Sequence, residues 1–297
     1  MAESESEDGG DVDDGPQAEV EGAAAAAPPS GSASASASDE DMRVLLESDD
    51  DLEEPADGWL LPPQAPEHAG RLTVLLDLDG TLISSFTPKR APRLPPAMRT
   101  HLVGQGSALN PGGVFVVERP GLPEFLLELA AFAEVVVFTA GLREYAEPII
   151  DAIDPSRALF AARVYREGTT RSDHYQCVKD MRRAGRALAR TVLVDDTPLA
   201  FLHQPSNGVP VLGFRGDPDD RLLGEAVLPL LQTLAGSRDV RPLLERRFDM
   251  WNWFRRHGYP ESVWAPPAKG AAPEALPAAA AAGAAATLRA RLQDQER

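Results

Sequence analysis

Short apolar runs alternate along this chain with longer segments of helical spacing. Residues 71–79 (RLTVLLDLD) form a continuous apolar run that ends in carboxylates, which is typical of a buried parallel strand. Further strand-like runs cover residues 134–138, 191–194 and 209–214. Helical spacing follows at residues 120–133, where an early proline marks the start, and at residues 142–153 and 220–235. This alternation predicts a three-layer, Rossmann-like α/β fold with a mostly parallel sheet.

Polar side chains gather where the predicted strands end. Asp77 and Asp79 close the first run, Thr139 follows the second, and Asp195 and Asp196 close the third. In open α/β sheets, ligands bind beyond the carboxyl ends of the strands, so these side chains are expected to share one site. Two carboxylates placed two residues apart on a strand repel each other, which favours a cation between them. Magnesium prefers such oxygen ligands.

The motifs of this region resemble a known family. Residues 77–82 (DLDGTL) resemble the first motif of the haloacid-dehalogenase superfamily of phosphotransferases. Five further motifs are similar to the branch that dephosphorylates the C-terminal domain of RNA polymerase II: RPG at 119–121, FTA at 138–140, YRE at 165–167, VKD at 178–180 and VDDTP at 194–198. Their order and spacing match that branch over about residues 71–240.

The resemblance assigns catalytic roles to four residues. Asp77 resembles the nucleophile that forms an aspartyl-phosphate intermediate. Asp79 would protonate the leaving oxygen, then activate water, and lend its backbone carbonyl to a metal ion. Thr139 resembles a hydroxyl donor to a phosphoryl oxygen, and Lys179 resembles the cation that offsets the charge of nucleophile and phosphate. Covalent catalysis with a nearby acid and base divides one hard displacement into two easier ones.

The same resemblance implies the binding residues. Asp195 and Asp196 would complete a Mg²⁺ site with Asp77 and Asp79, and Arg166 would lie near the substrate phosphate. Two positions depart from the branch, which commonly has an acidic residue where Gly80 stands and often has Asn where Asp196 stands.

Residues 84–117 are rich in proline and glycine and take the place of a small flap, without a large cap domain. An open site of this kind suits a phosphopeptide better than a sequestered metabolite. We therefore predict a Mg²⁺-dependent phosphoserine/phosphothreonine phosphatase, with the C-terminal domain of RNA polymerase II as a candidate substrate. One alternative is a small-molecule phosphatase of the same chemistry. Another is a binding protein, because residues 239–244 (DVRPLL) vaguely resemble the presequence receptor of the mitochondrial inner-membrane translocase.

Charge divides the 297-residue chain into unequal parts. Its formal charge is -17, and residues 1–70 hold 20 Asp and Glu but only one basic residue, Arg43. The remaining 26 acidic and 28 basic residues nearly balance, so a basic face for nucleic acid is not evident in the body. We predict a disordered acidic tail over residues 1–70, a phosphatase domain over 71–262 and an Ala/Pro-rich tail over 263–297.

The N-terminal sequence favours the nucleus or cytoplasm over the mitochondrion, because no secretory or organelle signal is recognisable in it. The acidic N-terminal segment lacks the pattern of a secretory signal or of an organelle presequence. No apolar run approaches the roughly 18–20 residues that cross a bilayer. A single cysteine, Cys177, excludes an internal disulfide and a multi-cysteine zinc site. The sequence leaves the oligomeric state open.

Overall fold

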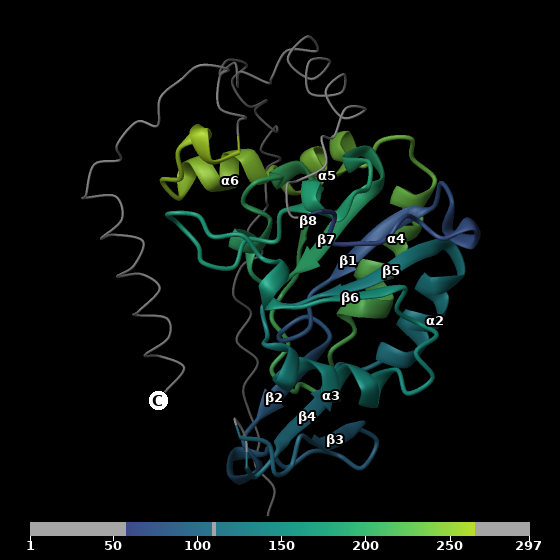
Figure 1. The fold of residues 1–297 in the computed structure, drawn as a ribbon, viewed down its shortest axis with the longest axis vertical. Helices are drawn as coiled ribbons and strands as arrows, with labels where there is room; N and C mark the ends of the chain where they lie inside the picture. Colours follow the sequence, from purple (N-terminus) through teal and green to yellow (C-terminus); the bar gives the residue numbers. More distant parts are fainter. Residues whose placement is uncertain (1–57, 109–110, 265–297) are drawn as a thin grey trace, which may run out of the picture. The chain divides into compact units, whose positions relative to one another are not determined.

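The computed structural model describes residues 58–108 and 111–264, which contain a parallel sheet covered on both faces. Its strand order is β6-β5-β1-β7-β8 (Figure 1). The strands are β1 (Leu72–Leu76), β5 (Ala133–Phe138), β6 (Ala162–Val164), β7 (Thr191–Asp195) and β8 (Gly208–Pro210). The predicted three-layer α/β fold is thereby confirmed.

Every residue of β1 is buried, because β1 lies at the centre of the sheet and both of its faces are covered. Leu72, Val74 and Leu76 belong to one apolar core, and Leu75 belongs to the other. Alternate residues of a strand point to opposite faces, so this continuous apolar run serves both cores.

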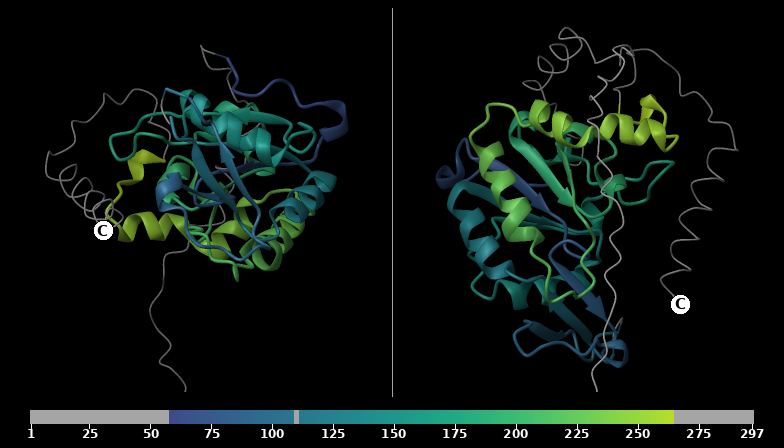
Figure 2. Two further views of the ribbon diagram at one scale, coloured as in Figure 1. Left: turned by 90° about the horizontal axis from the view of Figure 1, so that it is seen from below. Right: turned by 180° about the vertical axis from the view of Figure 1, so that it is seen from behind.

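The two cores use different covering elements. One face carries α2 (Leu122–Phe132), α3 (Arg143–Ile153), α4 (Leu228–Ala235) and α5 (Arg241–Phe248). Figure 2 shows α2 and α4 side by side over the sheet in the view from behind. The other face is covered by α6 (Met250–Arg256) and by short 3₁₀ turns, including η4 (Met181–Ala184) and η6 (Pro198–Phe201).

Several predicted elements are shorter than expected. The strand predicted over residues 71–79 ends at Leu76, so Asp77 and Asp79 lie on the turn beyond it. The helix predicted over 220–235 is a π-helical turn, η8 (Leu223–Val227), followed by α4. Pro229 has no N–H to donate one turn back, and a π-helical turn at this point accommodates that loss. The sequence did not single out β6, α5 or α6, which are short.

A small antiparallel sheet forms the predicted flap. Its strands are β2 (Ile83–Phe86), β3 (Thr100–Val103) and β4 (Val114–Glu118), in the order β2-β4-β3. It follows β1 directly, after the turn that carries Asp77 and Asp79. The flap thus begins within a few residues of the polar cluster at the end of β1.

The folded region extends past both predicted boundaries. Leu61 is buried in one core, and the Leu60 N–H donates to the Arg183 carbonyl at 2.8 Å, so the start predicted at residue 71 is too late. Trp264, beyond the predicted end at 262, is buried as well. These apolar residues lie within polar or proline-rich sequence, so composition alone did not predict that they are buried. Residues 1–57 and 265–297 of the two predicted tails lie outside the described residues.

None of the helices in the described part of the chain is long and apolar enough to cross a membrane.

Candidate active site

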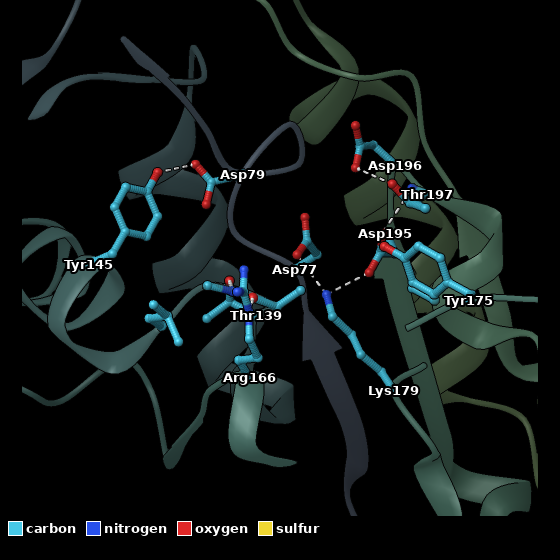
Figure 3. A pocket seen from close by; sticks show the side chains of 14 residues that line it. Asp77, Asp79, Thr139, Tyr145, Arg166, Tyr175, Lys179, Asp195, Asp196 and Thr197 are labelled. Atoms are coloured by element: carbon cyan, nitrogen blue, oxygen red, sulfur yellow. Dashed lines mark hydrogen bonds and ion pairs between the residues drawn. The ribbon is translucent and has the colours of Figure 1, made fainter. Parts of the chain in front are cut away.

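A cavity of about 360 Å³ opens where β1, β5 and β7 end. Figure 3 shows the side chains that line it. Every site residue predicted from the sequence lines this cavity, namely Asp77, Asp79, Thr139, Arg166, Lys179, Asp195 and Asp196. Segments more than 100 residues apart in the chain meet here, because parallel strands present their carboxyl ends at one edge.

Lys179 joins a carboxylate just after β1 to one at the end of β7, at the base of the cavity. Its Nζ atom lies 2.6 Å from Asp77 Oδ1 and 2.6 Å from Asp195 Oδ2. All three side chains are at least nine-tenths buried. Burial disfavours the charged form of Lys179, but the two carboxylates outweigh it and raise the pKa, so the ammonium stays charged and offsets part of their repulsion. The Thr81 hydroxyl donates to the other Asp77 oxygen, Oδ2, at 3.0 Å.

Three carboxylates can hold a metal ion beside this lysine. Asp77, Asp195 and Asp196 each offer an oxygen, and these oxygens all lie within 4.8 Å of one another. Lys179 alone cannot neutralise three carboxylates at this separation. Burial, with a smaller contribution from the Asp77 charge, raises the pKa of Asp196 to about 6. Three hard oxygen donors beside a single balancing lysine fit Mg²⁺.

Hydrogen bonds from hydroxyl and backbone N–H groups hold Asp195 and Asp196 in place at the end of β7. The Thr197 N–H donates to Asp195 Oδ1 at 2.8 Å, and the Thr197 hydroxyl donates to Asp196 Oδ1 at 3.3 Å. The Asp196 N–H donates to the Thr81 hydroxyl at 3.2 Å. Thr81 therefore bonds both acidic segments and sets their separation.

Asp79 lies apart from the three clustered carboxylates. Its Oδ1 atom accepts hydrogen bonds from the Ser85 hydroxyl at 2.9 Å and from the Tyr145 hydroxyl at 2.5 Å. Figure 3 shows the Asp79 carboxyl directed toward Tyr145 and away from Asp77. Burial raises the pKa of Asp79 and the nearby Asp77 carboxylate adds to this effect, which outweighs the opposing hydrogen bonds from Tyr145 and Ser85. A carboxyl with a raised pKa is suited to carrying a proton.

Thr139 and Arg166 also line the cavity. Thr139 is buried at the end of β5, and its Oγ1 accepts a hydrogen bond from the Gly141 N–H at 2.9 Å. Its hydroxyl hydrogen remains to be donated. Arg166 begins η3 (Arg166–Gly168) and is exposed, with its Nε donating to the Ala140 carbonyl at 2.5 Å. The guanidinium therefore stands at the edge of the cavity where an anionic substrate would enter.

Sequence reasoning missed three groups that shape the site. Ser85 and Tyr145 contact Asp79, and Tyr175 lines the cavity near Lys179. The available signal for Tyr145 was its place in the first turn of the helix that follows Thr139. A tyrosine there is an ordinary helix residue by sequence, so its position alone predicted no contact.

Arg119 of the RPG motif is a buried brace rather than a cavity residue. It donates to the carbonyls of Thr81 and Leu212, each at 3.0 Å. It also forms a two-point ion pair with Asp220, at 2.9 and 2.7 Å. The brace joins the turn after β1 to the segment after β8.

The sequence of this chain is similar to those of known phosphatases. Residues 72–241 match the family described as NLI interacting factor-like phosphatase. The chain is 38% identical over 188 residues to a probable C-terminal domain small phosphatase of Dictyostelium discoideum, which covers 63% of this chain and 58% of the relative. It is 37% identical over 185 residues to the human carboxy-terminal domain RNA polymerase II polypeptide A small phosphatase 2, covering 61% of this chain and 64% of the relative. The matched region thus spans about three fifths of these relatives.

A solved structure of Fcp1, an essential RNA polymerase II CTD phosphatase, aligns with 67% of this chain and 58% of its own. The TM-score is 0.40 and the sequence identity is 19%.

Proposed function

Because the chain belongs to the NLI interacting factor-like phosphatase family, we propose that it hydrolyses phosphoserine or phosphothreonine in proteins through a phosphorylated Asp77. One observation carries the proposal. The Asp77 carboxylate lies at the base of an open cavity, bonded to a buried lysine, with a second, separately held carboxyl two residues along the chain. This is the arrangement that a nucleophile and a separate acid/base require.

In the first step, an Asp77 oxygen attacks phosphorus and the bond from phosphorus to the serine or threonine oxygen breaks. Asp79 gives its proton to that departing oxygen, so the alcohol leaves neutral. The Thr139 hydroxyl donates to a phosphoryl oxygen, and Lys179 offsets the charge that Asp77 and the phosphate share. Stabilising charge in a site arranged beforehand is commonly a large part of catalysis.

In the second step, a water molecule attacks the phosphorus held on Asp77 and loses a proton to Asp79. The bond between phosphorus and the Asp77 oxygen breaks, which releases inorganic phosphate and returns both carboxyls to their starting states. Asp77, Asp195 and Asp196 would hold Mg²⁺, with the Asp79 backbone carbonyl as a further ligand. When bound, the ion supplies positive charge to the phosphoryl oxygens and to these carboxylates.

An open cavity beside a small flap supports a protein substrate over a small metabolite. The human relative is named for the carboxy-terminal domain of RNA polymerase II, so a phosphorylated peptide of that domain is the first substrate to test here. The nucleus or the cytoplasm is the proposed location. The two alternatives are hydrolysis of small-molecule phosphates and a binding role without catalysis. The test below distinguishes both from the proposal.

The test is hydrolysis of a phosphoserine peptide and of an aryl phosphate, with and without Mg²⁺, by the wild-type protein and by Asp77→Asn. Activity that requires Mg²⁺ and is lost in Asp77→Asn supports the proposal, and trapping of phosphate on wild-type Asp77 would identify the intermediate. Activity on small phosphate esters alone would favour the metabolite alternative. Folded wild-type protein with no activity on either compound would contradict the proposal and favour a binding role.

A further inference from the structure

We propose that Tyr145 and Ser85 are positioning residues that fix the Asp79 carboxyl for proton transfer to the leaving oxygen. The inference rests on the proposed function and adds two residues to it. Both hydroxyls contact the same atom, Asp79 Oδ1, at 2.5 Å from Tyr145 and 2.9 Å from Ser85. The two hydroxyls also lie 2.7 Å from each other, so the three oxygens form one cluster.

The two hydroxyls come from separate, firmly seated elements. Tyr145 is in α3, whose Ala146, Ile149 and Ile150 are completely buried in the apolar core. Ser85 is in β2 of the flap, where it pairs in register with the buried Val116 of β4. Asp79 itself is on the turn after β1. The cluster therefore joins the flap, the sheet edge and α3 at the acid/base.

Bonding at Oδ1 fixes which carboxyl oxygen is available. The carboxyl plane is held by two contacts on one side, which leaves Oδ2 as the oxygen to carry a proton toward the cavity. Without these contacts, Asp79 could rotate toward the Asp77, Asp195 and Asp196 cluster. Misplacing a catalytic group by about 1 Å can cost on the order of 100-fold in rate.

The experiment compares two substrates that differ in their need for an acid. A serine alkoxide is a poor leaving group and needs a proton, whereas nitrophenolate departs without one. We expect Tyr145→Phe to lower kcat/KM for a phosphoserine peptide by about 10- to 100-fold, less than the roughly 100- to 10,000-fold of complete general-acid catalysis because Asp79 itself remains. The loss for p-nitrophenyl phosphate is expected to stay within about 3-fold, because kcat/KM reports the first step and that step then needs no acid. Across a series of aryl phosphates, the variant should depend more steeply on leaving-group pKa than the wild type.

Ser85→Ala tests the same role without altering α3, and should show a smaller loss with the same preference for the phosphoserine peptide. Ser84→Ala is its matched control, because neighbouring residues of β2 point to opposite faces. Tyr165→Phe is the control for Tyr145→Phe, since it removes a hydroxyl from a buried tyrosine outside the cavity lining. Both controls should leave both substrates unchanged.

Equal losses on both substrates in Tyr145→Phe and Ser85→Ala would overturn the inference, because a general structural defect does not distinguish leaving groups. Unchanged kinetics in both variants would overturn it as well. Circular dichroism and thermal unfolding identify a variant that has not folded, and the remaining variant then decides the outcome. If the wild type itself is inactive on both substrates, the proposed function fails and this inference fails with it, whereas an active wild type isolates the role of the two hydroxyls.

Discussion

A Cβ atom at Gly80 would lie 2.3 Å from Oδ2 of Asp196, so the two residues fit together only because position 80 has no side chain. Gly80 also has φ 85°, in the left-handed region that glycine adopts most readily. Gly213 approaches the same carboxylate from another segment, since a Cβ there would lie 2.9 Å from Asp196 Oδ2. Gly80 and Asp196 are the two positions that depart from the branch pattern. The absence of a side chain at Gly80 leaves room for the Asp196 carboxylate.

Replacing Gly80 should therefore do more harm than its backbone strain alone. A left-handed backbone costs a non-glycine residue about 1–2 kcal/mol, and the clash at Asp196 adds to that cost. We expect Gly80→Ala to lower the free energy of unfolding by about 2–4 kcal/mol. Because Asp196 is displaced, the variant should also need a higher Mg²⁺ concentration for half-maximal activity. Gly104→Ala is the matched control, because Gly104 has φ 66° and no atom within 4 Å of a Cβ there. Urea unfolding of both variants tests this, and equal losses would exclude the contribution of Asp196.

Lys179 should stabilise the protein most when no divalent cation is present. Its removal leaves Asp77 and Asp195 buried and facing each other without compensation. We expect Lys179→Met to lose activity and, in the presence of a chelator, to lose about 3–5 kcal/mol of stability, less if one carboxyl takes up a proton. Added Mg²⁺ should recover part of that loss, because a ligand that binds the folded state stabilises it. Denaturant unfolding with EDTA or Mg²⁺ measures both effects, and Lys89→Met on the exposed flap turn is the control.

Asp220 should be needed for stability although it lies outside the cavity. It pairs at two points with Arg119, whose side chain is 1% exposed. Because Asp220 itself is partly exposed, we expect Asp220→Ala to cost about 2–3 kcal/mol, somewhat less than the roughly 3–5 kcal/mol of a fully buried pair that is broken. Asp219→Ala, an exposed neighbour, should cost less than about 0.5 kcal/mol. Thermal unfolding compares them, and similar melting temperatures for both variants would show that Arg119 finds other partners.

Glu245 should make the stability of the fold depend on pH. Burial raises its pKa from 4.5 to about 7, and the nearby Asp249 carboxylate adds to the shift. Folding therefore favours the protonated form, so its contribution is fully present below pH 4.5 and is lost as pH rises through 7. Glu245→Gln should be more stable than the wild type at pH 8, by on the order of 1 kcal/mol after solvent screening, and equal to it near pH 4.5.

The measurement for Glu245→Gln is the free energy of unfolding between pH 4.5 and 8, with the exposed Glu225→Gln as control. A difference between variant and wild type that does not change with pH would contradict the assignment.

Sequence alone established the alternation of strands and helices and the clustering of acidic residues at strand ends. The run at residues 71–79 was readable because a strand buried on both faces is mostly apolar, whereas its closing aspartates are not residues of an apolar core. Parallel strands bring their carboxyl ends to one edge, so Asp77, Thr139 and Asp195 were expected together, and they line one cavity. These features follow from local composition and from rules of sheet topology.

Only the tertiary structure decided the contacts between residues whose sequence carries no local signal. Tyr145 and Ser85 each look ordinary in their own elements, and their meeting at Asp79 depends on how α3 and the flap pack. The fit of Gly80 against Asp196 joins residues from two loops, so neither position reveals it. The burial of Leu61 was likewise not predicted, because a few apolar residues in a polar segment gain their stability only from the core they meet.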